Sequence, residues 1–167
     1  WNTRFLLLHL RVMKRILFIC LGNICRSATA EEVFRSLVRE AGREQDFEAD
    51  SAGIIDYHEG ELPDARMRRH ARARGYELTH RSRPVRRDDF GRFDLMVAMD
   101  VENERALREL SPDARLEGKI VRMADYLRCH EAAKIPDPYY GGPEGVEEVL
   151  DLLEDACGGL LAELCRD

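Results

Sequence analysis

The chain has 167 residues, and 26 Lys or Arg against 32 Asp or Glu give it a net charge of −6. This length fits one domain with a sizeable core. The acidic balance disfavours general binding to nucleic acid or to acidic membranes, and the longest apolar run is too short to span a bilayer. We therefore expect a cytoplasmic protein with neither nucleic acid nor membrane as a partner.

Residues 1–12 are predicted to be an appended or upstream segment without a catalytic role. His9 and Arg11 interrupt their apolar stretch and no small-residue cleavage site follows, so a signal peptide is not expected. Met13 stands directly before the first convincing strand, and the domain is expected over residues 13–167.

The cysteine pattern predicts reduced thiols and no structural metal. An odd number of cysteines without a signal peptide argues against a disulfide framework. Paired C-x-x-C elements are absent from the sequence, and the histidines have no ligand spacing around the cysteines, so we expect no zinc site. The five cysteines are Cys20, Cys25, Cys129, Cys157 and Cys165.

Strand and helix patterns alternate from residue 14 onward. Residues 14–20 (KRILFIC) form a short β-favouring apolar run, and residues 47–53 read as a second strand. Between them, apolar residues recur at steps of three and four, which predicts an amphipathic helix closed by Gly42. These residues are Ala30, Val33, Phe34, Leu37, Val38 and Ala41.

The second half of the chain continues the alternation. Asp64 can cap a helix that runs to Gly75. A buried strand is predicted over 93–99, with Asp100 as the cap of the next helix, and a fourth, shorter strand over 119–123.

The final segment predicts an irregular loop and a long helix. Residues 134–145 contain three prolines and three glycines, and an apolar stripe follows. The stripe consists of Val146, Val149, Leu153, Ala156, Leu160 and Leu164. The whole pattern predicts a single α/β domain, with a four-stranded parallel sheet and helices on both faces.

The stretch CLGNICRS, from Cys20 to Ser27, carries the strongest chemical signal. It joins a strand to a helix, at the edge of the sheet where α/β folds bind ligands. Gly22 and Asn23 tolerate positive φ, so the backbone can turn successive N–H groups inward beside the helix N-terminus, which favours an anion. Arg26 can clamp two oxygens of a tetrahedral anion, and these positive surroundings stabilise a thiolate at Cys20.

A structural interpretation of the same stretch is also open. Cys20 and Cys25 can be small buried hydrophobic residues and Arg26 an ordinary surface residue. C-x5-R-[ST] by itself is a loose pattern that will also occur by accident. Its place between a strand and a helix strengthens it as evidence for a phosphate site.

The segment FICLGNICRSATAEEVF resembles the signature of the low-molecular-weight protein tyrosine phosphatases. The resemblance continues through DSAG (50–53), YHEG (57–60), HRSRPV (80–85), FDLMVAMD (93–100) and DPYYG (137–141), and it covers residues 14–165. It implies a flavodoxin-like fold of the phosphotyrosine phosphatase I type, and a metal-independent, cofactor-free enzyme that hydrolyses phosphotyrosine and small aryl phosphates.

The resemblance also implies a two-step mechanism. Cys20 would attack phosphorus to form a phosphocysteine, Arg26 would stabilise the transition state, and Asp137 would protonate the leaving phenolate and then activate water. Ser27 would donate a hydrogen bond to the Cys20 thiolate. The implied phosphate-binding residues are Leu21, Gly22, Asn23, Ile24, Cys25, Arg26 and Ser27.

Supporting residues are implied in the same way. Asn23, Ser51 and His80 would brace the loop through hydrogen bonds, and Tyr57, Tyr139 and Tyr140 would form the wall beside the substrate ring. The implied partners are a phosphotyrosine protein as substrate and inorganic phosphate as product and inhibitor, with a monomeric enzyme. Capture of oxidised Cys20 by Cys25 would make the site redox-sensitive.

Without the resemblance, each supporting residue has an ordinary interpretation. His80 reads as a surface histidine, Ser51 and Asp137 as turn residues, and the tyrosines as residues at the edge of the core.

Two departures from the family pattern are Ala28, where many members have Pro, and Tyr57, where many have Trp.

The sequence also offers two rival functions, an arsenate reductase and a phosphotyrosine-binding module. Arsenate reductases that resemble this chain use a further pair of relay cysteines in mid-sequence, and this chain has none between Cys25 and Cys129. A phosphotyrosine-binding module without catalysis is disfavoured because every implied catalytic residue is present.

Overall fold

The computed structural model describes residues 12–139 and 141–166. A four-stranded sheet forms its centre, with strand order β2-β1-β3-β4 and every pairing parallel. The strands are β1 (Lys14–Cys20), β2 (Phe47–Gly53), β3 (Leu95–Ala98) and β4 (Ile120–Arg122). The predicted fold class, a parallel α/β sheet in one domain, is therefore confirmed.

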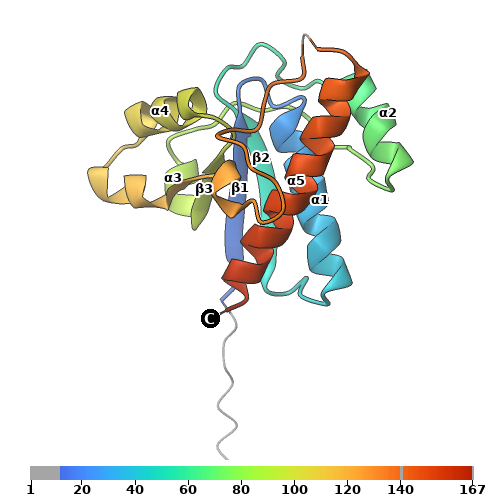
Figure 1. Ribbon diagram of the computed structural model, residues 1–167. Helices are drawn as coiled ribbons and strands as arrows, with labels where there is room; N and C mark the ends of the chain where they lie inside the picture. Colours follow the sequence, from blue (N-terminus) through green and yellow to red (C-terminus); the bar gives the residue numbers. More distant parts are fainter. Residues whose placement is uncertain (1–11, 140, 167) are drawn as a thin grey trace, which may run out of the picture.

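Helices cover both faces of the sheet (Figure 1). The α-helices are α1 (Arg26–Glu40), α2 (Ala65–Ala73), α3 (Asp89–Arg92), α4 (Val101–Leu110) and α5 (Pro143–Leu164). Helices α1, α2 and α5 contribute to one hydrophobic cluster, and α3 and α4 to a second cluster on the opposite face. Two 3₁₀ helices, η1 (Ala114–Lys119) and η2 (Met123–Tyr126), flank β4.

Strand β1 connects the two clusters because successive side chains of a strand point to opposite faces. Ile16, Phe18 and Cys20 belong to the cluster beneath α1 and α5, whereas Leu17 and Ile19 belong to the cluster beneath α3 and α4. All five are almost fully buried. The apolar run therefore reads as continuous in the sequence, as expected for a central parallel strand.

The order of the strands places a topological switch point at the carboxyl end of β1. The chain moves from β1 to β2 on one side and later to β3 on the other. Loops that leave adjacent strands in opposite directions open a crevice at that edge of the sheet, where ligands bind. Cys20 is the last residue of β1 and lies at this crevice.

Some element boundaries differ from the predicted ones. The strand predicted over 93–99 is shortened to β3, because the Phe93 N–H closes the short helix α3 on Asp89. The strand predicted over 119–123 is shortened to β4, since Lys119 ends η1. Helix α3 and both 3₁₀ helices are too short to produce a periodic pattern and were not predicted.

No helix in the described part of the chain has the length and apolar character needed to cross a membrane. Of the predicted N-terminal extension, residues 1–12, only Val12 lies within the described residues.

Candidate active site

The loop after β1 turns back on itself at Asn23. Asn23 has a φ of 57°, which Asn tolerates better than most residues. Gly22, also predicted to supply positive φ, does not adopt it. Instead, Gly53 at the end of β2 permits the turn, because a Cβ there would lie 2.9 Å from the Leu21 carbonyl oxygen and 3.1 Å from the Asn23 nitrogen.

The backbone amides of this loop are available to a ligand. Among the described residues, the N–H groups of 21–26 donate no hydrogen bond to another protein group. Helix α1 begins at Arg26, so the positive end of its dipole adds to these donors. A cluster of inward-turned amides at a helix N-terminus is a binding site for a phosphate-like anion.

Cys20 and Ser27 contact each other across this loop. The Cys20 Sγ lies 3.0 Å from the Ser27 Oγ, and both side chains are buried. Asn23 Nδ2 donates to the same Ser27 oxygen at 2.8 Å. Because that oxygen accepts from Asn23, its own hydrogen is free to point at the sulfur and stabilise a thiolate.

The fully buried Asn23 side chain is the centre of a wider network. Its Nδ2 also donates to Ser51 Oγ at 3.0 Å, while its Oδ1 accepts from the Arg83 backbone N–H at 3.1 Å and contacts His80 Nε2 at 3.0 Å. Since the amide oxygen has no hydrogen, His80 must carry its proton on Nε2. The structure thus brings Asn23, Ser51 and His80 together behind the loop.

Two carboxylates stand behind this network. His80 Nδ1 lies 3.2 Å from Glu31 Oε1 and 3.5 Å from Asp50 Oδ1. Burial raises the pKa of Glu31 to about 7 and lowers the pKa of His80 below its usual value. Both shifts favour the neutral forms in a site with little solvent.

Glu31, Asp50 and His80 also have ligand atoms within 4.8 Å of one another. These atoms already serve the protein: Glu31 accepts from Ser51 Oγ and pairs with Arg35 at 3.0 Å, and Asp50 pairs with Arg83. We therefore interpret the group as a brace for the loop.

Arg26 is held rigidly at the rim of the loop. Its guanidinium donates to Asp100 Oδ2 at 2.7 Å and to the Ile135 carbonyl at 3.0 Å, and its side chain is only 3% exposed. Asp100 uses its other oxygen to cap α4 through the Asn103 N–H. Burial lowers the pKa of Arg26, but Cys20, Asp100 and Asp137 more than compensate, and the net shift is upward. Arg26 therefore stays charged and oriented.

Asp137 faces Arg26 from the loop before α5. Its Oδ2 lies 3.5 Å from Arg26 Nη2, and its Oδ1 accepts the Tyr139 N–H at 3.1 Å. The carboxyl group is 42% exposed, so it can exchange protons with solvent. The structure therefore brings together Cys20, Arg26 and Asp137, although more than a hundred residues separate the first from the last.

A cavity of about 330 Å³ opens above the loop. It is lined by Cys20, Leu21, Gly22, Ile24, Cys25, Arg26, Ile55, Tyr57, His58, Asp137 and Tyr139. The rings of Tyr57 and His58 meet edge to face at 4.8 Å, and His58 lies 6.2 Å from Tyr139. The cavity thus combines polar groups at its base with aromatic rings at its wall. Tyr140, the third predicted wall residue, lies outside the described residues.

The chain matches a known protein family over nearly its whole length. The family model for low molecular weight phosphotyrosine protein phosphatase matches residues 15–167. The chain belongs to this family. The members are cysteine-dependent hydrolases, so the site is that of an enzyme, and the resemblance given by the sequence motifs is confirmed.

Curated relatives cover nearly the whole chain. A low molecular weight protein-tyrosine-phosphatase of Streptomyces coelicolor is 45% identical over 150 residues, which cover 89% of this chain and 92% of the relative. A low molecular weight protein-tyrosine-phosphatase of Bacillus subtilis is 38% identical over 156 residues, covering 93% and 98%.

Solved structures share the fold at similar coverage. A protein tyrosine phosphatase of Entamoeba histolytica, crystallised with Hepes in its active site, has a TM-score of 0.88 and 42% identity, and the match covers 90% of this chain and 96% of that one. The Bacillus subtilis structure has a TM-score of 0.85 and 38% identity, covering 93% and 96%.

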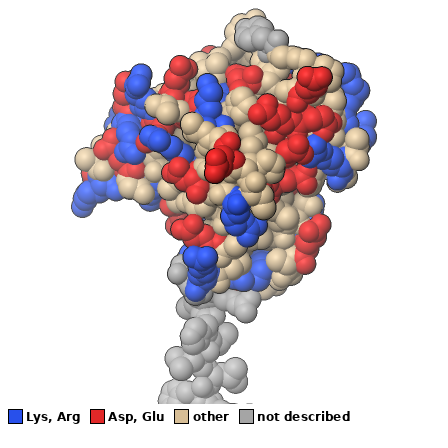
Figure 2. Space-filling view, in the orientation of Figure 1, with Lys and Arg blue, Asp and Glu red and all other residues tan. Residues whose placement is uncertain are grey.

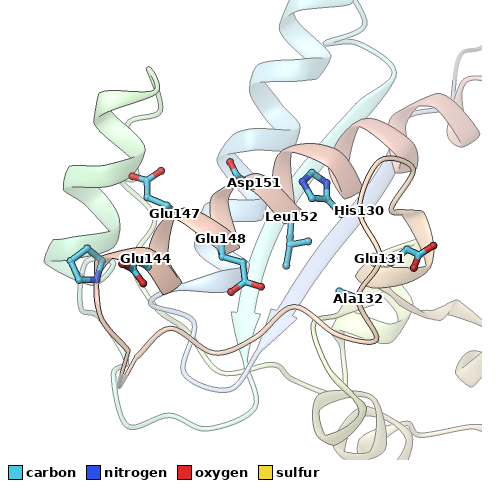
Figure 3. Close-up of a pocket in the computed structure, with 9 residues that line it drawn as sticks. His130, Glu131, Ala132, Glu144, Glu147, Glu148, Asp151 and Leu152 are labelled. Atoms are coloured by element: carbon cyan, nitrogen blue, oxygen red, sulfur yellow. The ribbon is translucent and has the colours of Figure 1, made fainter.

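A larger cavity, of about 520 Å³, lies between α5 and the segment 130–132. Figure 3 shows Glu144, Glu147, Glu148 and Asp151 along the helix on one side of it. The same stretch of α5 contributes acidic surface in Figure 2. Carboxylates repel a phosphate dianion, so this cavity does not suit the substrate of a phosphatase.

Several residues of the site were missed by sequence reasoning. His58 completes the aromatic wall, Asp100 orients Arg26, and Glu31, Asp50 and Arg83 contact the network of Asn23, Ser51 and His80. The sequence indicated Asp100 only as the N-cap of a helix, and this does not reveal its hydrogen bond with Arg26. All five residues lie within the quoted family motifs, which were the signal that could have identified them.

Proposed function

We propose that this chain hydrolyses phosphotyrosine in proteins, and small aryl phosphates, through a phosphocysteine on Cys20. The observation that supports this most is the convergence of Cys20, Arg26 and Asp137 on one cavity whose base is a set of unpaired amides. A nucleophile, an anion clamp and an acid within one cavity are the groups that transfer of a phosphoryl group to sulfur requires.

In the first step the Cys20 thiolate attacks phosphorus in line with the leaving oxygen. A sulfur–phosphorus bond forms, the phosphorus–oxygen bond to tyrosine breaks, and the phenolate takes the proton of the Asp137 carboxyl. The amides of 21–26 and the Arg26 guanidinium hold the three equatorial oxygens.

The second step restores the enzyme. The Asp137 carboxylate takes a proton from water, the water oxygen attacks phosphorus, and the sulfur–phosphorus bond breaks to release inorganic phosphate and the thiolate. The hydrogen bond from Ser27 favours this departure by stabilising the sulfur anion. Because the amides and Arg26 supply the positive charge, the mechanism needs no metal or cofactor.

The aromatic wall supports an aryl phosphate as substrate. Tyr57 is 79% exposed and Tyr139 38% exposed, so both rings can stack on a phenyl ring that enters from solvent. Inorganic phosphate carries the same oxygens as the substrate and should act as a competitive inhibitor. We further propose that the enzyme is monomeric and cytoplasmic. The molar mass of the purified chain, measured by light scattering, tests whether it is a monomer.

Replacing Asp137 tests whether its carboxyl group is the general acid that protonates the leaving phenolate. Phosphotyrosine leaves as a phenolate whose conjugate acid has a pKa near ~10, so Asp137→Ala should slow its transfer to Cys20 by on the order of 10²–10⁴. The loss should shrink steadily as the leaving phenol becomes more acidic. Pre-steady-state phosphoryl transfer across a series of aryl phosphates measures this slope.

Asp137→Asn is the matched control. It keeps an oxygen that can accept the Tyr139 N–H but has no acidic proton. It should therefore lose as much as Asp137→Ala if Asp137 is the acid. A loss of equal size for all leaving groups, or near-normal rates in Asp137→Asn, would mean that Asp137 only positions the loop.

Cys25 supports a redox-sensitive site. Peroxide oxidises the Cys20 thiolate to a sulfenic acid with release of hydroxide, and the Cys25 thiol then displaces water to form a disulfide. Burial, together with Asp64, Cys20 and Asp137, raises the pKa of Cys25, so capture should become faster as the pH rises. Activity should return with dithiothreitol in the wild type, and Cys25→Ser should recover less. Equal recovery in both proteins would assign Cys25 to packing alone.

A further inference from the structure

Helix α2 connects the two halves of the active site at its first turn. The Asp64 backbone N–H donates to the Ile24 carbonyl of the phosphate-binding loop at 2.8 Å. The Asp64 carboxylate caps the helix by accepting the N–H groups of Arg66 and Met67 at 2.9 and 3.1 Å. The backbone of Arg66 is thereby fixed relative to the loop that contains Cys20.

The Arg66 side chain reaches across to the segment that contains Asp137. Its Nη1 donates to the Gly141 carbonyl at 2.5 Å, and its Nη2 donates to the carbonyls of Tyr139 at 2.7 Å and Pro138 at 3.2 Å. One guanidinium thus binds three carbonyls within the four residues that follow Asp137. The side chain is 34% exposed.

The segment before Asp137 is anchored separately. Ile135 is fully buried, its N–H donates to the Met99 carbonyl at 2.9 Å, and its carbonyl accepts from Arg26. Asp137 therefore lies between an anchor two residues before it and the Arg66 contacts directly after it. With Arg66 removed, the second half of this proline- and glycine-rich loop would lose these three hydrogen bonds to α2.

From these contacts we infer that Arg66 is a positioning residue, which sets the distance of the Asp137 carboxyl from the leaving oxygen above Cys20. This inference rests on the proposed function, in which Asp137 is the general acid. A planar fork with several donors can bind three carbonyls at once, whereas a lysine ammonium at the same site cannot reproduce that geometry. A misplacement of about 1 Å in a reacting group can reduce a rate by roughly 10²-fold.

The kinetic test compares Arg66→Met with Arg69→Met, a change at an exposed arginine of the same helix. Arg66→Met and Arg66→Lys should slow phosphoryl transfer from phosphotyrosine roughly 10–100-fold, and less for acidic phenols. Arg69→Met should match the wild type. In an Asp137→Asn background, Arg66→Met should cause little further loss, because the acid that it positions is already absent. Two results would overturn the inference. One is a rate loss from Arg66→Met that adds fully to the loss from Asp137→Asn. The other is a rate loss from Arg66→Met of the same size for every leaving phenol, when the loss from Asp137→Asn depends on the phenol.

Hydrogen exchange gives a readout that does not depend on the acid. The Gly141 N–H donates to the Pro138 carbonyl at 3.1 Å and the Tyr139 N–H to Asp137. Both amides should exchange several-fold faster in Arg66→Met than in Arg69→Met. Unchanged exchange would contradict the inference. Faster exchange in Arg66→Met, combined with an Asp137→Asn variant that shows no leaving-group dependence, would retain the Arg66 anchor and reject Asp137 as the acid.

Discussion

Cys20→Ser should reduce turnover of aryl phosphates by on the order of 10⁶, because the covalent route is lost with its nucleophile. A serine hydroxyl at this position is a far weaker nucleophile than a thiolate. Among the described residues, the side chain at position 20 is hydrogen-bonded to Ser27, which is not a base that could activate such a hydroxyl. Steady-state assays with p-nitrophenyl phosphate measure the loss.

Binding should survive the same change. The loop amides and Arg26 hold the anion, and none of them depends on the sulfur for its position. Calorimetry should therefore show that Cys20→Ser still binds phosphate or vanadate. Cys129→Ser, a change at an exposed cysteine outside the cavity, is the matched control and should keep its turnover. Comparable turnover in Cys20→Ser would reject the phosphocysteine mechanism.

Arg26→Lys should lower turnover by on the order of 10³, although the charge is retained. Arg26 uses Nη1 for Asp100 and the Ile135 carbonyl, whereas Nη2, which lies 3.5 Å from Asp137 at the cavity, can donate to the phosphoryl oxygens. A lysine has one nitrogen, so a contact with Asp100 would draw it away from the substrate. The planar pair of donors that fits two oxygens of a phosphoryl group would be lost in either case.

Two measurements separate this effect from a loss of folding. The thermal unfolding of Arg26→Lys should remain cooperative, and its affinity for phosphate should fall with its activity. Activity close to that of the wild type would show that Arg26 is not the ligand of the anion. Unfolding of the variant at assay temperature would instead assign the loss to the buried contact with Asp100.

The local part of the site could be predicted from the sequence because it is contiguous. Cys20, the loop and Arg26 occupy one strand–turn–helix unit, and apolar periodicity on both sides identified the strand and the helix. The details of the turn were less predictable. Of the two loop residues expected to adopt positive φ, Asn23 does and Gly22 does not, and the close approach of Gly53 depends on the pairing of β1 with β2.

The distant part of the site depends on tertiary contacts. No local pattern relates Asp137 to Cys20, and its role came from the family resemblance alone. Asp100 showed its cap position in the sequence, but its contact with Arg26 exists only because β1 and β3 are neighbours in the sheet. The buried pair of Glu31 and His80 is equally invisible in the sequence, since one residue lies on α1 and the other in the segment after α2.

Rapid acid quenching of the wild type and of Asp137→Asn, mixed with p-nitrophenyl phosphate, tests the central claim most directly. Proteolysis and mass spectrometry of the quenched protein locate any phosphate that is bound covalently. We predict a phosphate on the peptide that contains Cys20, formed together with a burst of p-nitrophenolate and absent from Cys20→Ser. A covalent phosphate on any other residue, or an undiminished burst in Cys20→Ser, would contradict the account.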